Sequence, residues 1–188
     1  MRTRTVLPLA ILLVICFVAA ALAQSGPVKV HRKNTEPRTI ALIQHKGPYS
    51  DIPKVVESLY AEVEKGGLRI CGPLMTVYYN DPSKTPASDL FWDVRIPVTN
   101  PGMMKKGDID QLGFGFQDKA YVAYTYHVGP YETVGESYGL LFEWARTNRY
   151  DITGYITEVH WSQPDAKNPV TEIWLPVKEK TPAERGVR

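Results

Sequence analysis

The chain has 188 residues, of which 22 are Lys or Arg, 20 are Asp or Glu and 44% are hydrophobic. This length suits one domain, or two small fused units that share a core, and the composition is that of a globular protein. The charges nearly balance and form no basic stripe, which argues against binding to nucleic acid. Aromatic residues reach 11%, so we expect a surface or a pocket built from rings.

Residues 1–23 have the pattern of a secretory signal peptide. Arg2 and Arg4 precede an apolar run over residues 6–22, and Ala21-Leu22-Ala23 then matches a small-x-small cleavage site. The alternative is an uncleaved membrane anchor, because the run is close to the minimum of about 17 residues for a span. Cleavage removes two of the 22 basic residues and leaves 20 basic and 20 acidic ones.

The next part of the chain predicts a strand, a helix and two further strands. A strand is expected over Arg38–His45, and Gly47-Pro48 breaks it. Apolar residues spaced by three and four then predict a helix that stops at Gly66-Gly67. Its apolar face consists of Ile52, Val55, Val56, Leu59 and Val63. The closing strands are expected over Leu74–Asn80 and Asp89–Val98.

The same succession follows a second time. A strand over Lys119–His127 leads through Gly129-Pro130 into a helix that ends at Asn148. The apolar face of this helix consists of Val134, Tyr138, Leu141 and Ala145. Two strands, Tyr155–Ser162 and Val170–Val177, close the unit.

The two units are related by an offset of 82 residues. His45-Lys46-Gly47-Pro48-Tyr49 recurs as His127-Val128-Gly129-Pro130-Tyr131, and residues 41–82 and 123–164 share ten identities in 42 positions without a gap. We therefore expect two tandem β-α-β-β repeats with pseudo-two-fold symmetry. The expected order is a signal peptide (1–23), a flexible segment (24–36), one domain (37–178) and a C-terminal tail (179–188). Within the domain, repeat one (37–98), a linker (99–118) and repeat two (119–178) follow one another.

This pattern predicts an α+β fold in which antiparallel sheets carry helices on one face. Alternation along the strands assigns Trp92, Val94, Ile96 and Val98, and likewise Ile173, Leu175 and Val177, to the helix-covered core. We expect the other face to carry aromatic and charged residues, with Glu158 among them and Val159 and Trp161 turned to the core. An unpaired buried charge is costly, so this other face is expected to line a ligand groove.

These features resemble the gyrase-inhibitor-like family, the effector-binding domain of AraC- and MerR-type regulators. The resemblance rests on the two Gly-Pro-Tyr units, on Tyr78-Tyr79-Asn80-Asp81-Pro82 and on the closing segment Thr171–Val177, and it covers about residues 36–178. It implies a groove for drug-like, often cationic aromatic molecules, with a buried glutamate that falls on Glu158 here. Some members similar in fold hydrolyse DNA alkylators. A signal peptide and no helix-turn-helix argue against a transcription factor.

The candidate site residues all belong to the expected groove. Glu158 would hold a cation, and rings would add cation–π attraction; the alternatives are a solvated glutamate or a salt bridge to Arg95. Glu158 and Glu172 could also form a general acid–base pair. The full set of candidate ligand-binding residues is Glu158, Tyr78, Tyr126, Trp174, Glu172, Phe91, Arg95 and His160.

Other motifs point to no cofactor or metal. His45 and His127 precede the Gly-Pro turns and are expected to hold those turns, because a metal site would need further ligands. Cys71 would be the single cysteine after cleavage, which excludes an internal disulfide, and we expect it to be buried. No phosphate-binding glycine loop, His-Glu-x-x-His or Gly-x-Ser-x-Gly motif is present in the sequence.

The sequence therefore predicts an exported protein, periplasmic or secreted, that binds an apolar or aromatic small molecule, with a cationic ligand as one option. It would contact a membrane only if residues 6–22 stayed attached. The alternatives are a hydrolase that uses Glu158 and groove tyrosines, with no catalytic residue assigned, and a haem-binding or protein-interaction module. Binding is favoured over catalysis.

Overall fold

The computed structural model describes residues 29–99, 112–162 and 166–181. The expected signal peptide, most of the expected linker and nearly all of the C-terminal tail lie outside these residues. No helix within the described ranges is long and apolar enough to cross a membrane.

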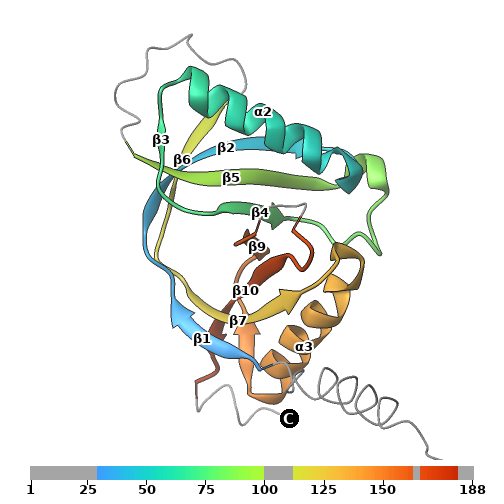
Figure 1. The fold of residues 1–188 in the computed structure, drawn as a ribbon. Helices are drawn as coiled ribbons and strands as arrows, with labels where there is room; N and C mark the ends of the chain where they lie inside the picture. The colour runs from blue at the N-terminus through green and yellow to red at the C-terminus, as the bar shows by residue number, and fades with distance from the viewer. Residues whose placement is uncertain (1–28, 100–111, 163–165, 182–188) are drawn as a thin grey trace, which may run out of the picture.

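Two helices lie on one face of a large, curved antiparallel sheet (Figure 1). The main path of the sheet runs β1-β7-β10-β9-β4-β5-β2-β6, with β3 paired to β5 and β8 paired to β10. The α+β prediction is confirmed. In Figure 1, α2 covers the upper strands and α3 the lower ones.

The elements follow in two similar series. The first consists of β1 (His31–Asn34), β2 (Arg38–Lys46), the 3-10 turn η1 (Tyr49–Asp51), α2 (Ile52–Lys65), β3 (Arg69–Ile70), β4 (Leu74–Tyr78), the 3-10 turn η2 (Ala87–Asp89) and β5 (Phe91–Thr99). The second consists of β6 (Gly113–Gln117), β7 (Tyr121–Val128), the 3-10 turn η4 (Tyr131–Thr133), α3 (Val134–Thr147), β8 (Tyr150–Ile152), β9 (Ile156–His160) and β10 (Val170–Glu179).

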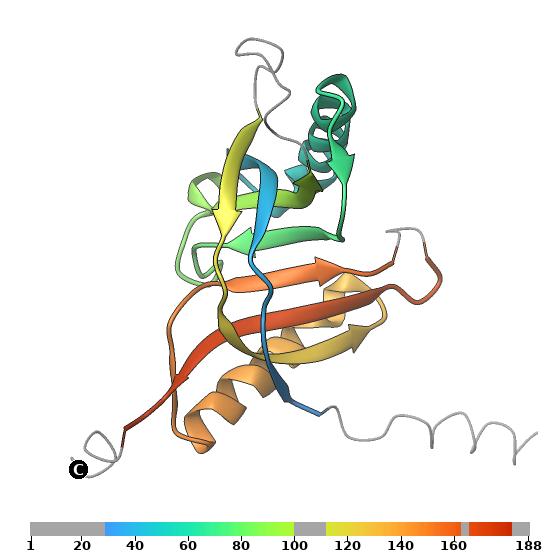
Figure 2. The ribbon, with the colours of Figure 1, turned by 90° about the vertical axis from the view of Figure 1, so that its left-hand side faces the viewer.

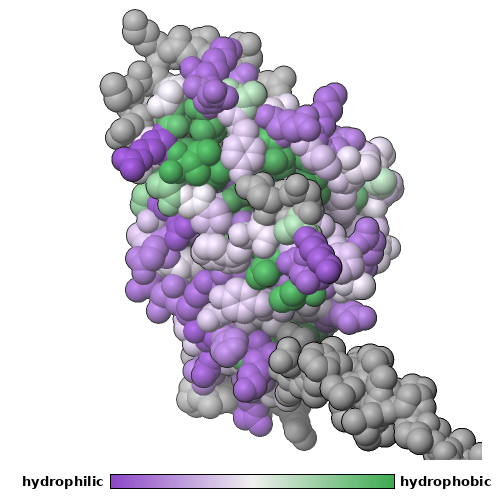
Figure 3. Space-filling view, viewed as in Figure 1, coloured by the Kyte–Doolittle hydropathy of each residue, from purple (hydrophilic) through white to green (hydrophobic). Residues whose placement is uncertain are grey.

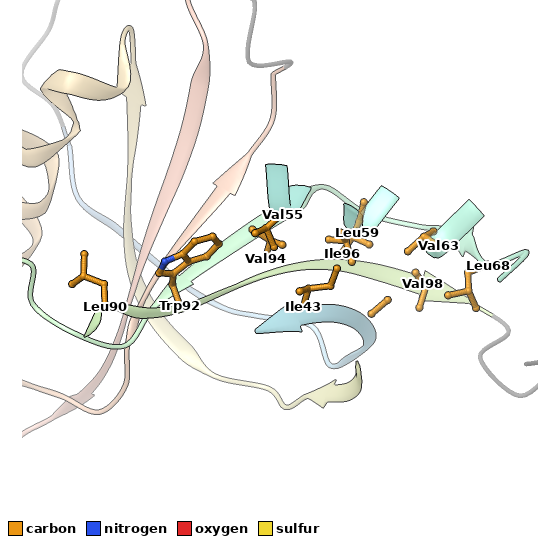
Figure 4. Packing of buried hydrophobic residues seen from close by; sticks show 11 residues of the cluster. Ile43, Val55, Leu59, Val63, Leu68, Leu90, Trp92, Val94, Ile96 and Val98 are labelled. Atoms are coloured by element: carbon orange, nitrogen blue, oxygen red, sulfur yellow. The ribbon is translucent and has the colours of Figure 1, made fainter. Parts of the chain in front are cut away.

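The helix-covered core is the one that the apolar spacing predicts. On α2, Val55, Leu59 and Val63 are buried against the strands (Figure 4). The strand residues beneath them are Trp92, Val94, Ile96 and Val98 of β5. On α3, Leu141 and Ala145 pack against a second cluster that contains Ile173, Leu175 and Val177. Full burial of one large apolar side chain stabilises the fold by about 1.5–3 kcal/mol. The burial of these residues therefore holds both helices on the same face.

Both helices end where the sequence predicts. Gly66 caps α2 and Gly67 adopts a positive φ of 63°, while Asn148 caps α3 and Arg149 has a φ of 62°. The left-handed conformation suits glycine and is less favourable for arginine.

The middle of the sheet is the pairing of β4 with β9. Thr76 stands opposite Glu158, with Leu74 opposite His160 and Tyr78 opposite Ile156. This pairing joins the strands under α2 to those under α3 in one continuous sheet.

Two segments expected to be irregular are strands instead. Part of the expected flexible segment forms β1, which pairs with β7, and part of the expected linker forms β6, which pairs with β2. The chain runs from β1 into β2 and from β6 into β7, so two long strands cross between the halves side by side (Figure 2). Thr35 N donates to Ala120 O at 2.8 Å at the crossing. The physical reason is that β2 and β7 would otherwise present unpaired backbone groups at sheet edges.

The face opposite the helices, here called the inner face, also holds a small core. Ile40, Met75, Val122, Val159 and Trp174 are buried together there. The expectation that this face would not pack as a core is therefore wrong in its middle. The crossing strands cover the face, and apolar residues fill the space beneath them.

The expectation for Cys71 is also wrong. Its side chain is exposed, although its backbone N–H donates to Pro97 O at 2.9 Å. Cys71 directly follows the two-residue strand β3, outside both helix-covered clusters.

Lys33 fastens β1 to the inner face. Its ammonium forms an ion pair with the buried carboxylate of Glu172 and lies 4.6 Å from the ring centroid of Tyr124 and 4.8 Å from that of Trp174. Trp161 Nε1 donates a second hydrogen bond to Glu172 at 2.9 Å.

We predict that Lys33→Met lowers the free energy of unfolding by about 2–3 kcal/mol. The variant leaves a buried carboxylate without its cation, and breaking a fully buried pair costs about 3–5 kcal/mol, but Lys33 is one-third exposed. Urea denaturation measures the change. Adding Glu172→Gln to Lys33→Met should recover part of the loss; no recovery in the double variant would contradict the ion-pair explanation.

Candidate functional site

The structure divides the candidate residues between the two faces of the sheet. Glu158 stands directly opposite Ile173 of β10, and Ile173 packs in the α3 core. Directly paired residues share a face. Glu158, Tyr78 and His160 therefore point to the helix side, whereas Phe91, Arg95, Tyr126, Glu172 and Trp174 belong to the inner face. The expected single groove with Glu158 on the face away from the helices is wrong.

The physical reason lies in the composition of β9. Both alternating sets of this strand mix apolar and polar residues, so alternation separates the two sets without telling which one faces a helix. Val159, expected to face the helix-covered core, instead packs with Met75 and Trp174 on the inner face.

The carboxylate of Glu158 is enclosed by tyrosine hydroxyl groups. Its side chain is 2% exposed. Tyr78 OH donates to Oε2 at 2.8 Å, and Tyr138 OH of α3 donates to Oε1. His160 Nε2 lies 3.9 Å from Oε2. Among residues 29–99, 112–162 and 166–181, no lysine or arginine forms an ion pair with this carboxylate.

A second ring of polar and aromatic contacts surrounds this group. The Thr76 hydroxyl and His160 Nε2 are 3.0 Å apart, and Tyr131 OH and His160 Nδ1 are 3.2 Å apart. Tyr49 packs edge-on against the Tyr78 ring with centroids 5.0 Å apart. The helix-side site, as we name it, consists of Glu158, Tyr49, Tyr78, Tyr131, Tyr138, Thr76 and His160. In the view of Figure 3, apolar residues gather in the upper part, and a smaller apolar group lies below the centre among pale and hydrophilic residues.

Sequence reasoning missed four members of the helix-side site. Tyr49 and Tyr131 end the two Gly-Pro-Tyr motifs, whose recurrence was recognised without assigning their rings a role. Tyr138 was expected on the buried face of its helix, and Thr76 lies within the expected strand Leu74–Asn80. The signal was therefore present, but only tertiary structure brings η1, η4 and α3 to one carboxylate.

Burial sets the protonation states of the site. It raises the pKa of the Tyr78 and Tyr138 hydroxyls well above the ordinary value, and the negative charge of Glu158 adds to this effect. Burial likewise raises the pKa of Tyr49 and Tyr131. Burial lowers the pKa of His160, although Glu158 opposes this shift. At neutral pH the tyrosines are therefore hydrogen-bond donors and His160 is uncharged.

The charged groups of the inner face are paired with one another. Arg95 Nε donates to Asp93 Oδ1 at 2.6 Å, and its Nη2 donates to Asp93 Oδ2 and, at 2.8 Å, to Tyr79 OH. Burial and the hydrogen bond to Asp93 raise the pKa of Tyr79 to about 12. The proposed salt bridge between Arg95 and Glu158 is wrong.

The pairing of Glu158 with Glu172 as an acid–base couple is wrong as well. Glu172 stands opposite Val159 in the register, so it points to the inner face and pairs with Lys33 there. The sheet lies between the two carboxylates.

The inner face is hollowed beneath the crossing strands. A pocket of about 200 Å³ is lined by residues of the central strands and of the crossing segments, among them Arg95 and Trp174. Phe91, Tyr126 and Glu172 are not part of its lining.

The two turn histidines hold their turns, as predicted. His45 Nε2 pairs with Asp51 Oδ2 at 2.9 Å, and His127 Nε2 lies 3.0 Å from Pro130 O. In the described part of the chain, no group of three or more His, Cys, Asp or Glu side chains could hold a metal ion.

Comparison with known proteins identifies the family. The model of the GyrI-like small molecule binding domain matches residues 28–178. The chain belongs to this family. No curated protein sequence matches it.

Several solved structures share the fold. The C-terminal domain of EcmrR is 21% identical with a TM-score of 0.70, and the match covers 82% of this chain and 100% of that one. A hydrolase from Listeria innocua is 15% identical with a TM-score of 0.63, covering 86% and 97%. SAV2435 bound to tetraphenylphosphonium is 10% identical with a TM-score of 0.53, covering 84% and 97%. At these identities the likeness concerns the fold alone.

We predict a specific loss of stability at mildly acidic pH from His160. Its ordinary pKa of 6.5 applies in the unfolded chain, and the folded value is lower. The contribution of neutral His160 to the free energy of unfolding is therefore fully present above about pH 6.5. It is lost as the pH falls toward the folded pKa, because the unfolded chain binds the proton first. Thermal unfolding between pH 7.5 and 5 should show a steeper fall for the wild type than for His160→Gln. Equal slopes would contradict this assignment.

Proposed function

We propose that this GyrI-like protein holds a cationic aromatic small molecule at the helix-side site, with Glu158 as the counter-ion. The single observation behind the proposal is a buried carboxylate whose hydrogen-bond donors are tyrosines and to which no described lysine or arginine is paired. Burial of such a charge is costly unless something compensates it. A bound cation supplies that compensation.

The rings around Glu158 support the same ligand class. A cation over the face of an aromatic ring gains about 0.5–2 kcal/mol, more where water is excluded. Tyr49, Tyr78, Tyr131 and Tyr138 are contributed by four different elements around one carboxylate. Since their hydroxyls keep their protons at neutral pH, they add no competing negative charge.

We expect a ligand to reach Glu158 by passing between Tyr49 and Tyr131. Both are partly exposed and stand in η1 and η4, the turns that lead into the two helices. Because Glu158 is closed off by Tyr78 and Tyr138, a ligand would have to displace at least one of these hydroxyls. SAV2435, which has a similar fold, is bound to tetraphenylphosphonium in its solved structure. This cation is therefore the first probe for the present chain.

The tandem duplication seen in the sequence supports the central position proposed for Glu158. The offset of 82 residues relates Thr76 to Glu158, and these two residues stand opposite each other in the β4–β9 ladder. The same offset exchanges the pair Leu74–His160 with the pair Tyr78–Ile156. A pseudo-two-fold axis through Thr76 and Glu158 accounts for this register, and it puts the glutamate between the two repeats.

We predict that tetraphenylphosphonium raises the melting temperature of the wild type and that Glu158→Gln weakens its binding at least tenfold. The substitution removes the charge and keeps the size of the side chain, and tenfold corresponds to about 1.4 kcal/mol. Isothermal titration calorimetry measures the affinity. Glu143→Gln on α3 is the matched control, because Glu143 is exposed and pairs only locally with Arg146 and Thr147.

Undiminished binding in Glu158→Gln would contradict the proposal. Turnover of an electrophilic substrate that is lost in Glu158→Gln, with the fold intact, would favour a hydrolase instead.

Export is a further part of the proposal, and it rests on the sequence of residues 1–23. We predict that the protein expressed with these residues in a bacterial host is recovered from the periplasm and begins at Gln24. Intact-mass spectrometry of the purified protein measures the cleavage. A protein that keeps residues 1–23 and sediments with membranes would instead be anchored.

A further inference from the structure

We propose that the inner-face pocket is a second small-molecule site, which takes a neutral ring-bearing molecule with a hydrogen-bond acceptor. The pocket of about 200 Å³ lies beneath the crossing strands, and its lining includes Thr35, Tyr79, Arg95, Asp118, Tyr155 and Trp174. The proposal does not depend on ligand binding at Glu158.

An unsatisfied donor is the first observation. Trp174 is 6% exposed, and its indole Nε1 is buried without a hydrogen-bond partner in the part of the chain that the structure describes. Buried polar side-chain atoms nearly always have a partner, so each exception calls for a missing one. This N–H is closed off from the adjoining pocket by neighbouring side chains. An acceptor on a small molecule in the pocket would therefore reach it by displacing one of them.

Arg95 provides further donors without adding net charge. Its Nε and Nη2 bind Asp93 and Tyr79, and Nη1 makes no hydrogen bond to a described residue. The charge of the guanidinium is balanced by the Asp93 carboxylate, which is fully buried. Asp118 at the lining would repel an anion. Donors in a neutral setting favour an uncharged acceptor, such as an amide or ketone oxygen.

The rings of the pocket favour a flat partner. Tyr79 and Tyr155 meet edge to face with centroids 4.8 Å apart, and both line the pocket together with Trp174. Aromatic side chains bind flat rings by offset or edge contacts. The pocket of about 200 Å³ has room for one ring with a short substituent.

The two sites are separated by the sheet itself. Thr157 of β9 lines the inner-face pocket, and its neighbour Glu158 points to the helices. Arg95, on one face, and Glu158, on the other, therefore serve different ligand classes. From the sequence, both residues were expected in one groove.

Benzamide is the probe, and the four indole N–H signals of the ¹⁵N-labelled protein are the readout. The Trp174 signal is assigned by its absence in Trp174→Phe. We expect benzamide to shift this signal downfield in a saturable way, as an N–H that gains a hydrogen bond does. Toluene, which has no acceptor, should leave the signal nearly unmoved. Benzoate and benzylammonium should bind at least fivefold more weakly than benzamide.

Two variants test the site by affinity, followed on the backbone amide of Thr157. Tyr155→Leu removes a ring from an exposed position, so the fold should be retained, and we expect benzamide to bind at least fivefold more weakly. Trp174→Phe keeps a ring and removes the donor, with the same expected loss. Trp144→Phe, at a tryptophan of α3 stacked on Tyr150 and outside the pocket lining, is the matched control and should bind as the wild type.

A benzamide-induced shift confined to another indole, or no saturable shift at all, would overturn the proposal. Unchanged affinity in Tyr155→Leu and Trp174→Phe would overturn it as well.

Discussion

The pairing of β4 with β9 is the contact on which the rest of this structure depends. It joins the strands beneath α2 to those beneath α3, and it sets Thr76 opposite Glu158 at the centre of the sheet. Because the side chains of a strand alternate between faces, the same register decides what lies on each side. A shift of one residue would turn Glu158 away from Tyr138 and move Val159 out of the inner core. The geometry of both candidate sites therefore follows from one strand pairing.

Burying a carboxylate in such a position costs folding free energy, and the surrounding tyrosines reduce this cost. Their hydroxyls satisfy the oxygen atoms without cancelling the charge. Lys33 and Glu172 show the other solution, in which the chain supplies its own cation between aromatic rings. Arg95 and Asp93 show it again. Among the buried acids of the described residues, Glu158 thus differs in having no lysine or arginine paired with it, which is the basis of the proposed cation binding.

The crossing strands account for the shape of the inner face. Since β1 completes the edge next to β7 and β6 completes the edge next to β2, each half of the sheet is finished by a strand that continues into the other half. The two crossing strands cover the space between the halves. Apolar residues fill part of this space, and the remainder is the pocket beside Trp174. Part of the segment that the sequence predicts as a linker (99–118) therefore lines the inner-face pocket.

The sequence by itself determined the α+β class, the order of the main elements, the helix ends and the residues beneath each helix. These features depend on local spacing: helical periodicity, β-branched runs and Gly-Pro or Gly-Gly breaks act over a few residues. It also singled out Glu158, Tyr78 and His160 as neighbours on one face. Only the tertiary structure decided which face that is, because β9 carries mixed residues on both sides and its orientation is set by strands distant in sequence. The pairing of β1 and β6 across the halves, and the meeting of Tyr49, Tyr131 and Tyr138 at one carboxylate, likewise depend on contacts between distant segments that no local pattern encodes.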